Sequence, residues 1–262
     1  MVVDNALAQL QKALQTELPP VPFVGAGLSV AVTGGAAQAS WVGLLEDGVK
    51  ECERVISPLP QGWGSQMRDQ LEHADMINCI TVAEQIVMRL HRVDGGSGFS
   101  LWIQEAIGHL QPTPGGEQTL AAVRDLAKGK IIVTTNYDTL IENTSGSQWR
   151  SHTWTDDDYR SVFRLPRVVV HLHGLPQQPG SIILGSADYR LLGESYANKV
   201  FDHSLFGAYS FMFIGCGTGL GDPHIGLIIE FVDAEIKWRH LTQSSQVKYE
   251  KSYILVRGSE LR

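Results

Sequence analysis

The sequence predicts an α/β fold with a doubly wound, mostly parallel sheet and an inserted helical cap at about residues 40–115. Two observations support this prediction. Short runs of β-branched and aromatic residues recur along the chain, and the continuously apolar ones, "IIV" and "VVV", are typical of strands buried on both faces of a parallel sheet. Helical patterns separate several of these runs, which is the order that places parallel strands between layers of helices.

The expected strands begin near the N-terminus and resume in the second half of the chain. Each is a short apolar or β-branched run bounded by glycine, proline or polar residues. They are residues 21–24, 131–135, 167–172, 182–184, 210–214 and 252–256.

Apolar residues at three- and four-residue steps predict the helices. They indicate helices over residues 4–16 and 40–55, and the segment 119–129, "TLAAVRDLAKG", is expected to lead into the next strand. From 65 to 110 the pattern is helical throughout, with no candidate strand. This stretch is therefore expected to form a helical cap inserted into the α/β domain.

The length and charge of the chain limit what it can be. Its 262 residues suffice for one large domain, which we expect to comprise a Rossmann-like core (20–40 and 116–262) and the helical insertion (about 41–115). Because the last expected strand ends close to Arg262, the chain can also be the N-terminal part of a longer protein. The formal net charge of -7 predicts no broad nucleic-acid surface.

Three cysteines, Cys52, Cys79 and Cys216, lie far apart and form no C-x-x-C pair. A zinc ribbon or a disulfide framework is therefore not expected, no other cluster has the spacing of metal ligands, and a reducing compartment is favoured. The N-terminal segment has an amphipathic helical pattern rather than that of a signal peptide, and no apolar run approaches the roughly 18 residues of a membrane span. We expect a soluble, cytoplasmic protein that binds neither metal nor membrane.

Four of the expected strands end in glycine or in compact polar residues. The carboxyl ends of parallel strands lie on one edge of the sheet, where ligands bind in open α/β folds, so these endings predict one binding crevice. The endings are Gly25-Ala26-Gly27-Leu28-Ser29, Asn136-Tyr137-Asp138, His173-Gly174 and Gly215-Cys216-Gly217-Thr218-Gly219-Leu220-Gly221-Asp222.

The glycine-rich endings allow two interpretations. Gly25 and Gly27 can serve only a tight strand-to-helix turn, or they can let the N–H groups of the next helix hold a pyrophosphate, with Ser29 adding a hydroxyl. The four glycines within residues 215–221 are more than a turn needs and favour close approach of the backbone to a ligand. Asp222, just before a proline, is expected to cap the following helix.

The polar endings allow two interpretations as well. Asn136 and Asp138 can cap a helix in "DTLIEN", whereas an asparagine at this edge can instead orient a water molecule or a ribose hydroxyl. His173 stands at the edge of the sheet before a glycine, and the ordinary pKa of a histidine, about 6.5, suits a base near neutral pH. The alternative is a structural histidine, which is what we expect of His171, one step deeper.

The motifs "PFVGAGLS", "VTTNYDTLIE", "VVHLHG", "ILGSADY" and "FIGCGTGLGDPHI" occur in this order over residues 20–256. In order and spacing the chain resembles the SIR2-like NADase domains of bacterial anti-phage defence proteins, which are distant relatives of the sirtuin deacylases. "TTNYD" together with "HLHG" is the specific part of this resemblance.

The resemblance implies roles for the residues at the strand endings. Asn136 and His173 match the catalytic pair of the family. The implied NAD-binding residues are Gly25, Ala26, Gly27 and Ser29 in the first loop, Asp138 near the nicotinamide carboxamide, Gly215, Gly217 and Thr218 near the adenosine ribose, and Asp222 in the "DPHI" element.

Two departures of the sequence from sirtuins favour NAD hydrolysis over deacylation. No cysteine lies between His173 and Cys216, where sirtuins have their zinc-ribbon pairs, and "VAVTGGAAQASW" replaces their segment after the first glycine loop. The resemblance therefore implies an NAD glycohydrolase that releases nicotinamide and ADP-ribose, an NAD-depleting effector in abortive infection. The alternatives are an NAD-dependent deacylase, a non-catalytic sensor of NAD or ADP-ribose, and a structural or oligomerisation module.

A free NADase would be toxic to its own host. The resemblance therefore also implies control of the activity, by homo-oligomerisation or by a fused or separate sensor or activator domain. Helices within residues 65–110 are a candidate place for such assembly.

Overall fold

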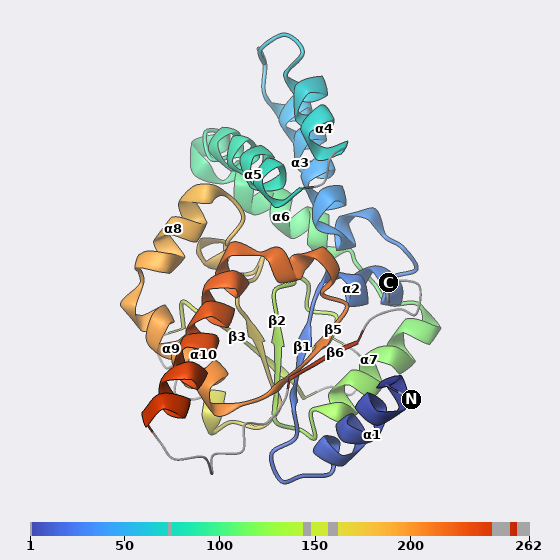
Figure 1. Ribbon diagram of the computed structural model, residues 1–262. Coiled ribbons are helices and arrows are strands. Elements are labelled where there is room, and N and C mark those ends of the chain that lie inside the picture. The colour runs from blue at the N-terminus through green and yellow to red at the C-terminus, as the bar shows by residue number, and fades with distance from the viewer. Residues whose placement is uncertain (1, 73–74, 144–147, 157–161, 243–251, 256–262) are drawn as a thin grey trace.

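A six-stranded parallel sheet forms the centre of the fold (Figure 1). The computed structural model describes residues 2–72, 75–143, 148–156, 162–242 and 252–255. The strand order is β3-β4-β2-β1-β5-β6, and every neighbouring pair is parallel. The strands are β1 (Val21–Val24), β2 (Ile131–Thr134), β3 (Arg150–Thr153), β4 (Val168–His171), β5 (Phe211–Ile214) and β6 (Tyr253–Leu255). The predicted α/β class with a parallel sheet is confirmed.

Helices cover both faces of this sheet. Along the central strands alternate side chains enter two different cores. Phe23 and Val133 pack with α9 (Tyr196–Ala208) and α10 (Pro223–Thr242), whereas Val24 and Ile132 pack with α2 (Ala26–Val32) and α7 (Pro114–Leu126). Burial on both faces explains why the central strands are continuously apolar. The helices are α1 (Val2–Leu14), α2 (Ala26–Val32), α3 (Trp41–Val55), α4 (Trp63–Glu72), α5 (Met76–Leu90), α6 (Gly98–Gly108), α7 (Pro114–Leu126), α8 (Ser186–Glu194), α9 (Tyr196–Ala208) and α10 (Pro223–Thr242).

Helices α3 to α6 form the cap, which lies beyond the carboxyl ends of the strands, at the top of Figure 1. Ser40 caps α3 by accepting the N–H of Gly43, and Asp75 caps α5 in the same way. Gly48 lets α3 pack closely, since a Cβ there would lie 2.7 Å from the ring of Trp102. The helical character predicted for residues 65–110 is confirmed.

One predicted strand is wrong, and one observed strand was not predicted. Residues 182–184 form no strand. Only four residues lie between the short 3₁₀ helix η4 (Pro179–Ser181) and α8, and they form a buried connection in which Ile183 donates its N–H to the carbonyl of His173. Strand β3 was not expected, because "RSHT" is polar. It pairs at one edge of the sheet, where its first two residues are exposed.

Helix α7 begins five residues earlier than the pattern of residues 119–129 predicts. Thr113 caps it by accepting the N–H of Gly116, and Pro114 takes the first helical position. A Cβ on Gly116 would lie 2.1 Å from the carbonyl oxygen of Val32. The glycines that suggest a loop in the sequence therefore allow a helix to pack against the end of α2.

The path of the chain creates a topological switch point. From β1 the chain moves to β2 and then to the β4–β3 side of the sheet, and it later crosses to β5 on the other side of β1. In open α/β sheets, ligands bind at such a point, outside the carboxyl ends of the two strands. The loops that follow β1 and β5 are the two glycine-rich loops.

Candidate active site

A cavity of about 570 Å³ lies at this switch point, between the strand ends and the cap. Its volume is in the range of small-molecule and cofactor sites. All four strand endings lie at this cavity. Of the eleven residues that the sequence predicts as catalytic or NAD-binding, nine line its wall. These are Gly25, Ala26, Gly27, Asn136, Asp138, His173, Gly215, Gly217 and Asp222. Ser29 lies behind the wall. Thr218 belongs to η5 (Gly217–Gly221), and its side chain falls outside the described part of the chain.

The cap contributes an apolar wall that no motif in the sequence marks. Val42 and Leu44 come from α3, Met76 and Cys79 from the start of α5, and Ile107 from α6. In the sequence these residues are indistinguishable from the core positions of amphipathic helices. The cavity is thus polar along the sheet and largely apolar along the cap.

The two glycine-rich loops touch each other directly. Gly27 donates its N–H to the carbonyl oxygen of Gly215 at 2.8 Å, and Gly25 donates to Ile214 at 2.9 Å. A Cβ on Gly25 would lie 2.6 Å from the Cα of Cys216, and one on Gly27 would lie 2.7 Å from the oxygen of Gly215. Neither position has room for a side chain.

This contact changes the interpretation of the first loop. Gly25 and Gly27 are required so that two segments of backbone can meet, whether or not a ligand is bound. The first three residues of α2 are Ala26, Gly27 and Leu28. Gly27 donates its N–H to Gly215 and Leu28 donates to Gly25, so within the described residues only Ala26 has an N–H without a protein acceptor. A pyrophosphate would find fewer free amides at this turn than the motif suggests.

A buried chain of hydrogen bonds fixes the side chain of Asn136. Its Nδ2 donates to Ser29 Oγ at 2.8 Å, and Ser29 Oγ donates to Asp138 Oδ2 at 2.6 Å. Since the single hydroxyl proton of Ser29 goes to Asp138, its oxygen can only accept, and Asn136 must present its NH₂ group. The amide oxygen of Asn136 is then left as an acceptor for other groups. Ser29 therefore orients Asn136 from behind the cavity wall.

Asp138 begins a turn rather than capping a helix. Its Oδ1 accepts the N–H of Leu140 two residues on, an arrangement that competes with helix formation, and residues 140–142 form a turn. The helix expected in "DTLIEN" is therefore wrong. Burial raises the pKa of Asp138, and the hydrogen bonds from Ser29 and Leu140 oppose this rise.

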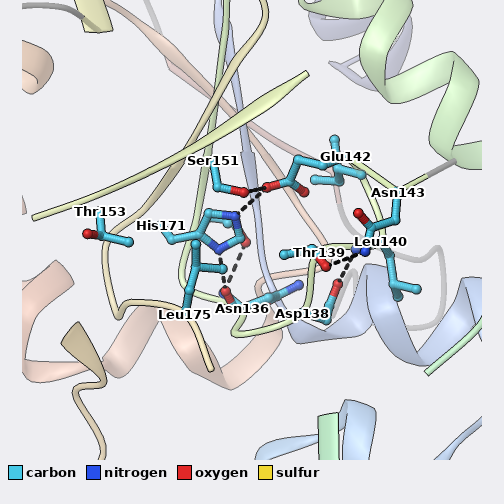
Figure 2. Close-up of polar contacts among 12 residues, drawn as sticks. Asn136, Asp138, Thr139, Leu140, Glu142, Asn143, Ser151, Thr153, His171 and Leu175 are labelled. Carbon is cyan, nitrogen blue, oxygen red and sulfur yellow. Dashed lines mark hydrogen bonds and ion pairs between the residues drawn. The ribbon is translucent and has the colours of Figure 1, made fainter. Parts of the chain in front are cut away.

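His171 holds the backbone of Asn136 through a hydrogen bond (Figure 2). Its Nδ1 lies 2.9 Å from the carbonyl oxygen of Asn136, and its Nε2 lies 2.7 Å from Oε1 of Glu142, which also accepts from Ser151. Burial lowers the pKa of His171, but Glu142 and the Asn136 carbonyl outweigh burial and raise it. Both ring nitrogens of this fully buried histidine face oxygen atoms of the protein, which agrees with the structural role expected for it.

His173 lies in the turn after β4, with its side chain 5% exposed. The ring of Tyr189 meets it edge-on, with centroids 5.7 Å apart, and His224 stacks against it at the same distance. Its Nε2 is buried and makes no hydrogen bond to any described residue, although Oδ1 of Asp222 lies 3.5 Å away. His173 is thus fixed by its surroundings while its polar atoms are largely unused.

Asp222 is the N-cap of α10, as predicted. Its Oδ1 accepts the N–H groups of His224 at 2.9 Å and Ile225 at 3.3 Å, while its Oδ2 accepts the hydroxyl of Tyr189 at 2.5 Å. Burial alone raises the pKa of Asp222, but His173, Tyr189 and the helix amide outweigh it and lower the pKa to about 2. The group is therefore a carboxylate at neutral pH. Tyr189, which lies within the motif "ILGSADY", also lines the cavity. Nothing in the sequence indicates its contact with Asp222.

Comparison with protein families agrees with this geometry. The family model described as the SIR2-like domain matches residues 130–260, which is half of the chain. The chain belongs to the SIR2-like domain family. SIR2-like domains bind NAD and the family includes NAD-dependent enzymes, so a function related to NAD follows in general.

The matched segment of the SIR2-like domain holds three of the four strand endings, with Asn136, His173 and Asp222. The first glycine loop lies outside it but is joined to it by the contact between Gly27 and Gly215. Within the described residues, no group of three or more His, Cys, Asp or Glu side chains is placed to hold a metal ion. None of the described helices is long and apolar enough to cross a membrane.

Proposed function

We propose that this SIR2-like domain is an NAD glycohydrolase, which cleaves the nicotinamide–ribose bond of NAD to give nicotinamide and ADP-ribose. The observation that carries the proposal is the convergence of Asn136 and His173, from the ends of two neighbouring strands, on one cavity. The amide oxygen of Asn136 is available as a hydrogen-bond acceptor. The imidazole of His173 is fixed by its neighbours, and its Nε2 makes no hydrogen bond to any described residue. These groups suit the orientation and deprotonation of a water molecule.

The chemistry makes modest demands on the protein. When the bond between ribose C1′ and the pyridinium nitrogen breaks, its electron pair stays on nitrogen and nicotinamide leaves neutral, so no general acid is needed. Water supplies the new C1′–O bond, and its proton passes to His173 and then to solvent. The balance is NAD⁺ and water giving nicotinamide, ADP-ribose and one proton.

Each wall of the cavity has a part in this scheme. Asn136 accepts a hydrogen from the attacking water and sets its direction, while His173 takes the proton, a step typically worth about 10²- to 10⁴-fold in rate. The apolar cap wall excludes bulk solvent. The glycine loops and Asp138 hold the remainder of the substrate, whose binding energy fixes the reacting geometry.

Deacylation is the less favoured activity. The cysteine pairs that support the peptide cleft of sirtuins are missing from the sequence. The cavity is bounded on the side of the cap by α3, α5 and α6, which suits a small substrate.

The test is incubation of the purified chain with NAD at several protein concentrations, with nicotinamide and ADP-ribose separated by chromatography. Asn136→Ala and His173→Ala are expected to lower turnover at least ~100-fold. The matched controls Asn143→Ala and His109→Ala change the same residue types at exposed positions outside the cavity wall and should retain it. Calorimetry with ADP-ribose and thermal unfolding check that the variants fold.

Three outcomes would overturn the proposal. Binding of NAD without turnover at any concentration indicates a sensor module. Turnover only with an acyl-lysine peptide indicates a deacylase. A chain that binds no NAD at all is a structural or oligomerisation module.

We also propose that the enzyme acts in the bacterial cytoplasm as an NAD-depleting effector of anti-phage defence, controlled by homo-oligomerisation or by a sensor or activator domain. The support is the resemblance of its motifs to defence-associated SIR2-like domains. Turnover per molecule that rises steeply with protein concentration would favour activation by assembly. In infected bacteria that express the chain, NAD levels should fall only in cells carrying the wild type and not Asn136→Ala.

A further inference from the structure

We propose that Asp222 and Tyr189 are positioning residues, which hold His173 with its Nε2–H directed at the Asp222 carboxylate and leave Nδ1 to act on the substrate side. The catalytic consequence rests on the proposed glycohydrolase function. The arrangement of the histidine does not, and it is tested separately below.

The placement of Asp222 fixes the proton of the histidine. Oδ1 of Asp222 lies 3.5 Å from the buried Nε2 of His173, and Nε2 makes no hydrogen bond to any described residue. A lone pair on Nε2 would face a carboxylate and be repelled, whereas an N–H would be attracted. The neutral ring therefore carries its proton on Nε2. Contacts of this kind are often long without substrate and shorten in the complex.

Tyr189 holds both members of this pair. Its hydroxyl donates to Oδ2 of Asp222 at 2.5 Å, and its ring meets the edge of His173 with an interplanar angle of 83°. Burial, and then the Asp222 carboxylate, raise the pKa of Tyr189 well above its ordinary value. The hydroxyl thus stays protonated and remains a donor. Tyr189 comes from α8, which also packs against α5 of the cap.

A second ring also packs against His173. His224 stacks on it with an interplanar angle of 28°. His224 is held by Asp202, 2.8 Å from its Nε2, and Asp202 accepts from Asn198 at 2.9 Å. The face of His173 is therefore backed by a second ring that cannot turn freely. Only the side toward the cavity is left for a ligand.

The competing explanation is that Asp222 serves only as the N-cap of α10. Serine is as good an N-cap as aspartate, but its shorter side chain cannot reach Tyr189 or face the imidazole. Asp222→Ser therefore keeps the cap and removes the positioning contact. Tyr189→Phe keeps the packed ring and removes only the hydroxyl.

The first measurement is a two-bond ¹H–¹⁵N spectrum of the full chain labelled with ¹⁵N-histidine, with His173 assigned by His173→Gln. At a pH where the His173 ring is neutral, the wild type should show its proton on Nε2, protected from exchange with water. Asp222→Ser should lose the protected signal, and Tyr189→Phe should exchange faster while keeping it, because Asp222 retains its helix amides. A proton on Nδ1 in the wild type, or an unchanged signal in Asp222→Ser, overturns the inference whether or not NAD is cleaved.

The second measurement separates positioning from substrate binding. Asp222→Ser should lower kcat by ~10- to 100-fold, the usual cost of removing a group that orients a working histidine, with a smaller change in KM. A raised KM at unchanged kcat would instead make Asp222 a substrate contact and refute the positioning role.

The matched controls are Asp156→Ser and Tyr209→Phe. Asp156 also stands beside a histidine, 3.2 Å from Nδ1 of His152, and accepts a backbone N–H, yet it lies outside the cavity wall. Tyr209 stacks on Phe163, also away from the cavity. Both variants should leave the His173 signal and kcat as in the wild type.

Discussion

The contact between the two glycine loops predicts that Gly27→Ala loosens the site and destabilises the fold. The new methyl group would lie 2.7 Å from the carbonyl oxygen of Gly215 and 3.1 Å from its Cα, both backbone atoms that cannot rotate away. Overpacking of this kind costs ~1–3 kcal/mol, and lengthening the hydrogen bond between Gly27 and Gly215 adds ~1 kcal/mol. Alanine is the better helix former by up to ~1 kcal/mol. The net loss is about 1–3 kcal/mol.

Urea unfolding and thermal unfolding measure the loss of stability, and a fall in Tm of roughly 2–10 °C is expected for a chain of this size. Calorimetry with ADP-ribose should show an affinity lower by more than about tenfold, because both displaced loops line the cavity. Gly193→Ala is the matched control: it lies in α8 with open space around the added Cβ, so it should be neutral or stabilising by up to ~1 kcal/mol. Wild-type stability and affinity in Gly27→Ala would show that the loops need no such contact.

Two further predictions follow from the polar contacts. Ser29→Ala should lower kcat, because the Asn136 amide loses its fixed direction, and should lower the free energy of unfolding by ~1–3 kcal/mol, because the buried Asp138 loses a donor. Kinetics and urea unfolding check this against Ser65→Ala, which changes an exposed position of α4. The native pKa of Asp222, about 2 against an ordinary 3.8, lies below the unfolded value. Its stabilisation is therefore complete above about pH 4 and lost as the pH falls through about 2. Roughly 2 kcal/mol of wild-type stability should disappear over that window in urea unfolding, and Asp222→Ser should lack this component.

The sheet could be predicted from the sequence because a strand buried on both faces is continuously apolar, and this pattern can be recognised without knowing any tertiary contact. A run such as "IIVT" or "VVVH" is apolar on both alternating sets of side chains, as a central parallel strand requires. The same signal misled at residues 182–184, which are buried but unpaired. Hydrophobicity reports burial, whereas strand pairing depends on which backbone lies alongside. Strand β3, polar and at the edge, left no mark at all.

The candidate site was predictable only in part, for a related reason. Parallel strands bring their carboxyl ends together, so the residues at those ends could be grouped without knowing any contact. What each residue touches depends on segments far away in the chain. Ser29 meets Asp138 across 109 positions, and Tyr189 meets Asp222 across 33. A motif carries the residue type but not the partner, which is why Gly27 suggests a phosphate and in fact contacts Gly215.

The pattern of buried contacts argues for chemistry over passive binding. Asn136 is held twice, through its side chain by Ser29 and through its backbone by His171. His173 is held by Asp222 and by the rings of Tyr189 and His224. Buried polar groups are costly unless they are paired, so a structural module gains little from keeping so many at one cavity. A passive NAD binder needs donors and acceptors directed at the ligand. It does not need a histidine base such as His173, with Nε2 directed at a carboxylate and Nδ1 available to the substrate. Pre-organised groups of this kind are what hydrolysis requires, and the contacts behind the cavity wall therefore favour the glycohydrolase over the sensor.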